Sequence, residues 1–146
     1  MSLIKEVEMA IRIRVKRIYE PPSPQDGFRI LVDRLWPRGM CKEKAKVDLW
    51  LRDMAPSNEL RKWYGHDPDK WTEFKKKYLG EIGEKKEEFE LLRKKARQGT
   101  VTFLFSSKEE KLNNAAALKE FVERGRGDSP SARAARLSSP KSQVEG

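Results

Sequence analysis

The fold is decided by the stretch Phe28-Arg29-Ile30-Leu31-Val32-Asp33-Arg34-Leu35-Trp36. It is rich in β-branched and aromatic residues, and its central run is apolar on both faces of an extended chain. Strands that are covered on both faces have this composition, and they are typical of parallel sheets. We therefore predict an interior strand here.

Three further segments are predicted to form strands. Residues 12–19 alternate charged and apolar side chains, which is the pattern of a strand with one buried face. Residues 100–105 are an apolar run of strand-forming residues between Gly99 and two serines. A shorter alternating segment at 47–53 ends before Pro56, which prevents a regular ladder from continuing.

Helices are predicted between these strands. Ser57 is a suitable N-cap for a helix over 58–64 that Gly65 ends. Apolar residues then recur at helical spacing from Trp71 to Ala96, with a weak point at Gly80 and Gly83, so a long or broken helix is expected. The pattern at 107–110 resembles a capping box, and it predicts that the final helix begins there.

The order of these elements predicts an α/β fold: a single compact domain with a small central, mostly parallel sheet and helices packed on it. We expect the domain to span 11–124. Residues 1–10 are expected to be an N-terminal extension or scar, in which Met1-Ser2-Leu3 resembles an expression-vector remnant. Residues 125–146 are rich in Gly, Ser, Arg, Ala and Pro, and we expect them to form a flexible basic tail.

The composition limits the function classes. The chain has 146 residues, of which 37% are hydrophobic and 38% charged, so a core can form beneath a charged surface. No apolar run is long enough to span a membrane. Cys41 is the single cysteine, which excludes an internal disulfide and a zinc site with several cysteines. We expect a cytoplasmic protein without a metal or cofactor, in which Cys41 is an incidental thiol.

The net charge of +9, from 32 basic and 23 acidic residues, favours anionic partners. Nucleic acid, nucleotides and phosphorylated metabolites all belong to this class. No Walker motif, dinucleotide-binding glycine motif or nucleophile elbow is present in the sequence, so the common nucleotide and hydrolase signatures are missing.

The end of the interior strand is the strongest candidate site. Arg34 and Arg38 flank Trp36 there, and Gly39 would let the backbone approach an anion closely. Guanidinium groups offer forked donors that match phosphate and carboxylate, and open α/β sheets bind ligands at the carboxyl ends of their strands. The alternative interpretation pairs Arg34 with Asp48 or Asp53, leaves Arg38 solvated and gives Trp36 a packing role.

His66 is the candidate general acid or base, because histidine titrates near neutrality. The adjacent Asp67 is suited either to orient the imidazole or to cap the following helix. The alternative places His66 in a packed turn between helices. A single histidine does not specify a reaction.

Several blocks resemble the YeaO-like family of small prokaryotic proteins. They are 33–39, 48–51 with 55–57, 60–66 and the late Asn113-Asn114-Ala115. The resemblance implies a compact α/β fold without an agreed substrate or cofactor, and it adds Asn113 to the ligand-binding candidates. Family members often carry a histidine where this chain has Leu112, and an aromatic-Ala-Ala strand end in place of Ser106-Ser107.

The leading hypothesis is an uncharacterised protein with an arginine-lined cleft for a small phosphate- or carboxylate-bearing ligand, and whether it is also an enzyme stays open. The second is a nucleic-acid-associated protein that uses the basic helix near Lys75 and the tail. The third is a partner-binding or homo-oligomeric module without catalysis.

Overall fold

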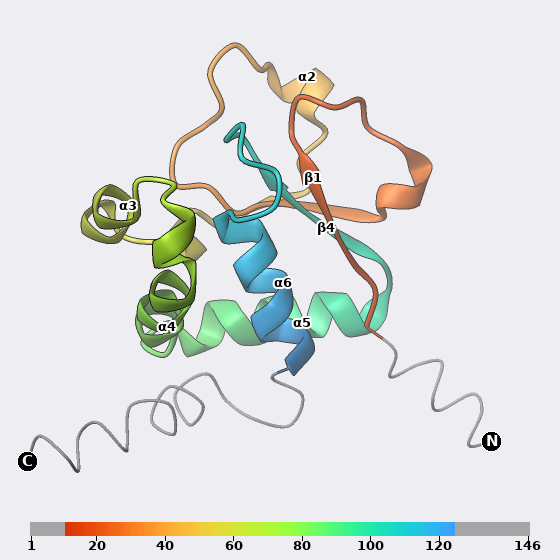
Figure 1. Ribbon diagram of the computed structural model, residues 1–146. Helices are drawn as coiled ribbons and strands as arrows, with labels where there is room; N and C mark the ends of the chain where they lie inside the picture. The colour runs from red at the N-terminus through yellow and green to blue at the C-terminus, as the bar shows by residue number, and fades with distance from the viewer. Residues whose placement is uncertain (1–10, 125–146) are drawn as a thin grey trace, which may run out of the picture.

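A computed structural model describes residues 11–124 (Figure 1). The expected extension at 1–10 and the expected tail at 125–146 lie outside these residues. The described part of the chain has no helix that is both long and apolar enough to cross a membrane.

The sheet has four parallel strands in the order β1-β4-β2-β3. They are β1 (Ile13–Arg17), β2 (Phe28–Leu31), β3 (Leu49–Trp50) and β4 (Val101–Phe105). The predicted interior strand is confirmed, because β2 pairs with β4 on one side and with β3 on the other. β4 lies between β1 and β2, and all five of its residues are buried. The predicted α/β class with a mostly parallel sheet is therefore confirmed.

The two faces of the sheet are covered unequally. On one face Ile30 and Phe103 pack in a large core with α4 (Trp71–Ile82), α5 (Lys86–Gln98) and α6 (Asn114–Arg124). On the other face Leu31 and Leu104 form a smaller cluster with Ala45 of α2 (Lys42–Ala45). In Figure 1, α2 lies at the top and α4 and α5 at the bottom. The chain thus places its helices on both faces, as expected for a buried parallel sheet.

The helices between residues 58 and 98 follow the sequence prediction, whereas the short helix α2 was not predicted. α3 (Asn58–Tyr64) begins at the predicted cap Ser57, whose hydroxyl accepts a hydrogen bond from the Leu60 amide, and the predicted break occurs between α4 and α5. Short 3-10 turns cover Pro24–Asp26, Arg52–Met54 and Pro68–Lys70. The strands β2 and β3 are shorter than predicted, because the chain turns away from the sheet after Leu31 and after Trp50.

The predicted start of the final helix near Ser107 is wrong. The Ser107 hydroxyl and the Glu109 carboxylate accept hydrogen bonds from amides between 109 and 112, which makes this stretch a turn. α6 begins instead at Asn114, and the Asn113 side chain accepts a hydrogen bond from the Ala116 amide. Asparagine is among the best N-cap residues, so the local chemistry explains the later start.

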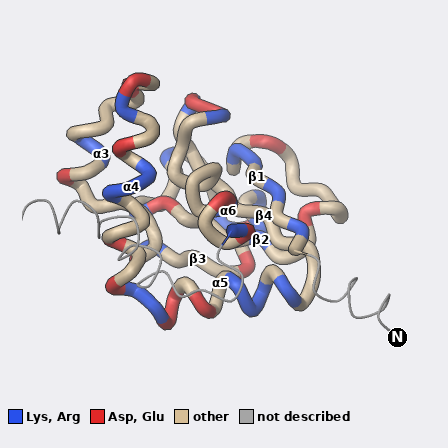
Figure 2. The backbone as a smooth tube through the Cα atoms, turned by 60° about the horizontal axis from the view of Figure 1, so that its bottom comes forward, with Lys and Arg blue, Asp and Glu red and all other residues tan. Residues whose placement is uncertain are grey.

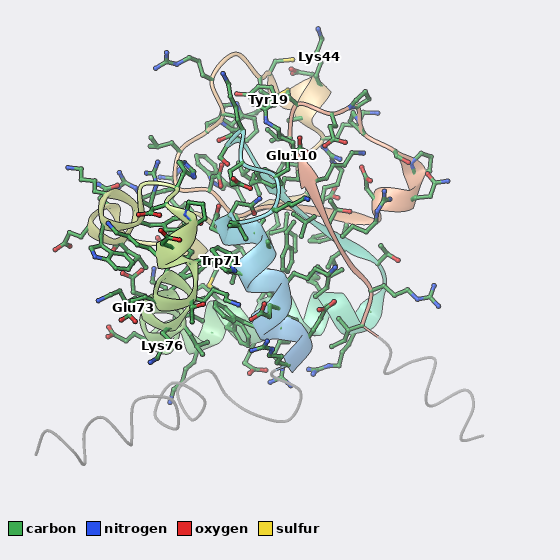
Figure 3. All side chains as sticks on the ribbon, viewed as in Figure 1. Tyr19, Lys44, Trp71, Glu73, Lys76 and Glu110 are labelled. Carbon is green, nitrogen blue, oxygen red and sulfur yellow. The ribbon has the colours of Figure 1, made fainter. Side chains whose placement is uncertain are left out.

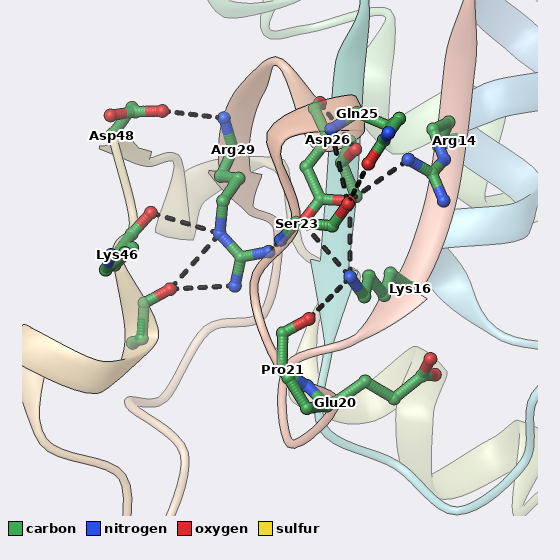
Figure 4. Close-up of polar contacts among 12 residues, drawn as sticks. Arg14, Lys16, Glu20, Pro21, Ser23, Gln25, Asp26, Arg29, Lys46 and Asp48 are labelled. Carbon is green, nitrogen blue, oxygen red and sulfur yellow. Dashed lines mark hydrogen bonds and ion pairs between the residues drawn. The ribbon is translucent and has the colours of Figure 1, made fainter.

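A cluster of ionised side chains joins β1 to the turn before β2 and to the start of β2 (Figure 4). Asp26 has no exposed side-chain area, and it forms ion pairs with Arg14, Lys16 and Arg29. Arg29 also donates to the carbonyl oxygens of Ala45 and Lys46. We call the four charged residues the Asp26 cluster.

Burial opposes ionisation of Asp26, yet its pKa lies below the ordinary value of 3.8. The hydrogen bond from the Ser23 amide, together with those from Lys16 and Arg29, outweighs the cost of burial. A carboxylate that receives several charge-assisted hydrogen bonds stays ionised inside a fold. The Asp26 cluster is therefore a satisfied structural site.

Candidate functional site

The carboxyl ends of β2 and β4 lie side by side in the middle of the sheet. The chain leaves β2 toward the face that α2 covers, and it leaves β4 toward α6 on the opposite face (Figure 1). Neighbouring parallel strands whose connections diverge in this way open a crevice, and ligands of open α/β proteins bind in it.

A pocket of about 520 Å³ occupies this crevice, and we call it the carboxyl-edge cleft. Its walls come from the segment after β2, from α3 and the turns around it, from α4 and from the segment after β4. The lining residues are Asp33, Arg34, Leu35, Trp36, Pro37, Arg38, Ala55, Pro56, Asn58, Arg61, Lys62, Tyr64, His66, Phe74, Ser106, Ser107, Asn113 and Asn114.

All but one of the predicted ligand-binding residues meet in the cleft. Those that line it are Arg34, Trp36, Arg38, His66 and Asn113. Gly39 does not line it. Its φ is +79°, and an added Cβ would meet no atom within 4 Å, so it serves a solvent-exposed turn.

The floor of the cleft is held by Asp33. Its carboxylate accepts hydrogen bonds from the amide and the hydroxyl of Ser106, each 2.8 Å long. The side-chain amide of Asn114 donates to the same carboxylate at 3.2 Å and to the carbonyl oxygen of Val32 at 2.9 Å. Asp33 therefore joins the end of β2, the end of β4 and the start of α6. These contacts make it a structural element of the cleft and occupy both of its oxygens.

The basic side chains of the cleft, in contrast to Asp33, have no partners in the described chain. Arg34, Arg38, Arg61 and Lys62 are exposed, and within residues 11–124 none of their side-chain nitrogens forms a hydrogen bond or an ion pair. Asp33 is the single carboxylate among the lining residues, so four cations face one anion.

The alternative ion pair of Arg34 with Asp48 or Asp53 is not found in the described chain. Asp48 instead accepts a hydrogen bond from the backbone amide of Arg29. Arg38 contributes its carbonyl oxygen to the hydroxyl of Tyr19, which fixes the backbone at that point and leaves the guanidinium free to turn toward the cleft.

His66 lies at the rim in a turn that follows α3. Its φ is +57°, and the preceding Gly65 has a φ of +52°. Non-glycine residues rarely adopt this conformation, and where they do the site is often functional. Asp67 accepts a hydrogen bond from the Asp69 amide, so it caps the next turn and does not orient the imidazole. The pair therefore does not form an acid-base dyad.

Tyr64 and Asn113 are engaged in structural hydrogen bonds within the cleft wall. The Tyr64 hydroxyl donates to the carbonyl oxygen of Leu112 at 2.8 Å, and burial followed by the charges of Glu109 and Asp67 raises the pKa of Tyr64 to about 12. Asn113 is 3% exposed, and its amide donates to the carbonyl oxygen of Glu109. These groups shape the wall, and Tyr64 stays protonated at neutral pH.

Glu109 lies behind this wall, and its pKa is below the ordinary value. The amides of Leu112 and Lys111, which donate hydrogen bonds to its carboxylate, are the main cause, and an electrostatic contribution from His66 acts in the same direction. His66 thus has a carboxylate nearby, but that carboxylate is already used by the backbone.

Sequence reasoning missed Arg61 and Lys62 as cleft residues. They lie in the same sequence block as His66, and one turn of α3 separates Arg61 from Tyr64, which also lines the cleft. This helical spacing could have indicated that Arg61 lies beside the cleft. No sequence pattern indicates that Phe74 lines it, because the position of Phe74 depends on how α4 packs against α3.

The basic residues on α4 are partly committed to other contacts. Lys75 pairs with Glu120 at 3.1 Å and lies over the ring of Trp71, and Lys77 lies over the ring of Trp63. Figure 3 shows Trp71 turned toward α6, whereas Glu73 points away from the domain.

Basic residues gather in two places on these helices, at Lys75-Lys76-Lys77 of α4 and in the second half of α5, where Figure 2 shows a blue stretch after the acidic residues of the first half.

The described residues contain no group of three or more His, Cys, Asp or Glu side chains that would hold a metal ion. Cys41 is exposed at the start of α2, and it does not line the cleft.

Comparison with known proteins places the chain among uncharacterised relatives. Residues 12–142 match the model of a family described as the inactive DUF488-N3 subclade. The uncharacterized protein Rv3073c of Mycobacterium tuberculosis is 40% identical over 111 residues, which cover 76% of this chain and 93% of the relative. The uncharacterized protein YeaO of Escherichia coli is 37% identical over 112 residues, which cover 77% and 97%. No solved structure shows significant similarity to the chain.

Proposed function

The chain belongs to the YeaO-like family, and from this premise we propose that it binds a small phosphate- or carboxylate-bearing ligand in the carboxyl-edge cleft. The matching subclade is described as inactive, which favours binding over turnover as the role of the cleft.

One observation carries the proposal. Arg34, Arg38, Arg61 and Lys62 line a single cleft, and within residues 11–124 their side chains form no ion pair. Clefts focus the field of the charges that line them, so anions are concentrated there. Guanidinium groups also bind phosphate and carboxylate through two parallel hydrogen bonds. A bound anion would supply the missing counter-charge.

His66 is proposed as an additional hydrogen-bond donor to the ligand. It lies at the rim, it is exposed, and no described side chain accepts a hydrogen bond from its ring. The turn that holds it has an unusual backbone conformation, which keeps the imidazole beside the end of α3. We propose a positioning role for this residue.

The nucleic-acid alternative has less support in the described region. Lys75 is committed to Glu120, and the basic residues of α4 and of the second half of α5 lie outside the carboxyl-edge cleft. For the compartment, the exposed thiol of Cys41 supports a reducing environment, and we propose the cytoplasm on this ground.

The proposal is tested by calorimetric titration of the full chain with inorganic phosphate and citrate at low ionic strength. Arg38→Ala is expected to weaken binding about tenfold or more, because a hydrogen bond to a charged group contributes about 1.5–3 kcal/mol. Arg97→Ala, an exposed arginine of α5 outside the cleft, is the matched control and is expected to bind as the wild type does. A folded Arg38→Ala protein with wild-type affinity would overturn the proposal.

A further inference from the structure

The carboxyl-edge cleft has an apolar side that a simple anion leaves unused. Leu35, Trp36 and Pro37 lie between the two arginines of the segment after β2, and Tyr64 and Phe74 contribute from α3 and α4. Building on the function proposed above, we propose that the ligand is an organic anion with an aromatic ring, whose phosphate or carboxylate faces the cations and whose ring covers the apolar side.

The volume of the cleft supports a ligand of this size. About 520 Å³ falls within the roughly 300–1,000 Å³ of pockets that enclose small organic molecules. An inorganic phosphate or a short carboxylate would occupy a small part of this space and would leave most of the lining in contact with water.

Leu35 is the clearest sign of a missing partner. Its residue surface is 63% exposed, whereas the other large hydrophobic residues that count as exposed, Tyr19 and Trp63, reach 39% and 36%. Its neighbour in sequence, Arg34, lines the same cleft. A ligand that reaches the guanidinium group and also covers Leu35 removes apolar surface from water, which is favourable in proportion to the area covered.

The aromatic residues favour a ring over an alkyl chain. Tyr64 and Phe74 are stacked with ring centroids 4.3 Å apart and an interplanar angle of 24°. Trp36 is fixed by a hydrogen bond from its indole nitrogen to the carbonyl oxygen of Met40 and by an edge contact with Trp50. Tyr64 and Phe74 are 4% and 2% exposed and back the wall of the cleft, whereas the half-buried Trp36 offers part of its ring to a further ring, and such contacts add to simple burial.

The two chemical requirements come from different residues, so they can be tested separately. The anionic group depends on Arg34, Arg38 and the basic residues of α3, whereas the ring depends mainly on Leu35 and Trp36. Leu35 is the better residue to change, because its exposed side chain contributes little to the core.

The experiment compares three probes of similar charge by calorimetry: phenyl phosphate, glycerol phosphate and inorganic phosphate. Wild type is expected to bind phenyl phosphate about tenfold more tightly than glycerol phosphate, since burying a ring contributes more than one factor of ten in affinity. Leu35→Ser is expected to reduce this preference severalfold without changing the affinity for inorganic phosphate. Arg38→Ala is expected to weaken binding of all three.

The outcomes separate this inference from the proposed function. If phenyl phosphate and glycerol phosphate bind equally and Arg38→Ala weakens both, the ring requirement is wrong and the anion site stands. If none of the three phosphates binds, and citrate and benzoate do not bind either, both proposals fail. Two further probes carry a ring: adenosine monophosphate has a phosphate and benzoate has a carboxylate. The anionic group of the natural ligand class is expected to give the tighter complex, so the comparison distinguishes ring-bearing phosphates from ring-bearing carboxylates.

Discussion

Arg29 and Arg34 lie on the same segment of chain, yet the fold uses them in opposite ways. Arg29 is 4% exposed, and its guanidinium pairs with Asp26 and with the carbonyl oxygens at the end of α2. Arg34 lies past the carboxyl end of β2, where it is exposed and has no side-chain partner among residues 11–124. The Asp26 cluster thus holds charges that stabilise the fold, whereas the carboxyl-edge cleft holds charges that the fold does not need.

The sharpest way to break this comparison is to remove Asp26. Asp26→Ala is expected to lower the free energy of unfolding by about 3–5 kcal/mol, because it leaves buried or half-buried cations without their carboxylate. Urea unfolding followed by circular dichroism measures the change. Arg34→Ala is the matched control, and it is expected to stay within about 0.5 kcal/mol of the wild type. A loss below about 1 kcal/mol for Asp26→Ala would show that the two regions do not differ as described.

Two glycines with positive φ, Gly27 near the Asp26 cluster and Gly39 near the cleft, allow the two regions to be compared through their backbones. A Cβ on Gly27, beside the Asp26 cluster, would lie 2.1 Å from the carbonyl oxygen of Thr100, whereas a Cβ on Gly39 would meet nothing within 4 Å. Gly27→Ala is therefore expected to cost about 2–4 kcal/mol, the sum of backbone strain and a steric clash. Gly39→Ala is expected to cost about 1 kcal/mol from strain alone. Thermal unfolding of the two variants checks the difference, and equal losses would contradict it.

The smallest expected effect is a change in unfolding free energy at low pH. The folded pKa of Asp26 is lowered, so its ionised form stabilises the fold above the ordinary carboxyl pKa near 3.8. This contribution is lost as the pH falls through the folded pKa, below that value. The difference in unfolding free energy between wild type and Asp26→Asn is expected to be constant from pH 7 to pH 5 and to shrink toward pH 2. A difference that persists unchanged at pH 2 would place the stabilisation elsewhere.

The features that local sequence encodes were predicted well. The apolar run around Ile30 identified the interior strand, because burial on both faces leaves a compositional trace. The position of Arg34 and Arg38 after that strand predicted that they lie at the carboxyl edge of the sheet, and the structure brings both to one cleft. Family resemblance added Asn113, which lines the cleft as the cap of α6.

The features that depend on distant contacts were not predicted. The role of Arg29 rests on Asp26 across a loop and on carbonyl oxygens near Ala45, and no periodicity in the sequence reveals such pairs. The start of α6 was placed too early, because a turn at Ser107 uses the same side-chain chemistry as a helix cap. Phe74 reaches the cleft through the packing of α4 against α3, which sequence spacing alone does not fix.

The order of strands in the sheet also determines when the sheet can form during translation. β1 pairs with β4 and with no other described strand, and β4 lies 84 residues further along the chain, from Arg17 to Val101. During translation, β1 has no strand to pair with until residues 101–105 have left the ribosome. The edge of β2 that later pairs with β4 is also unpaired until then. Contacts of such long sequence separation slow folding and leave strand edges open in the meantime. β4, whose five residues are all buried, is thus the strand that is made last and that completes the sheet.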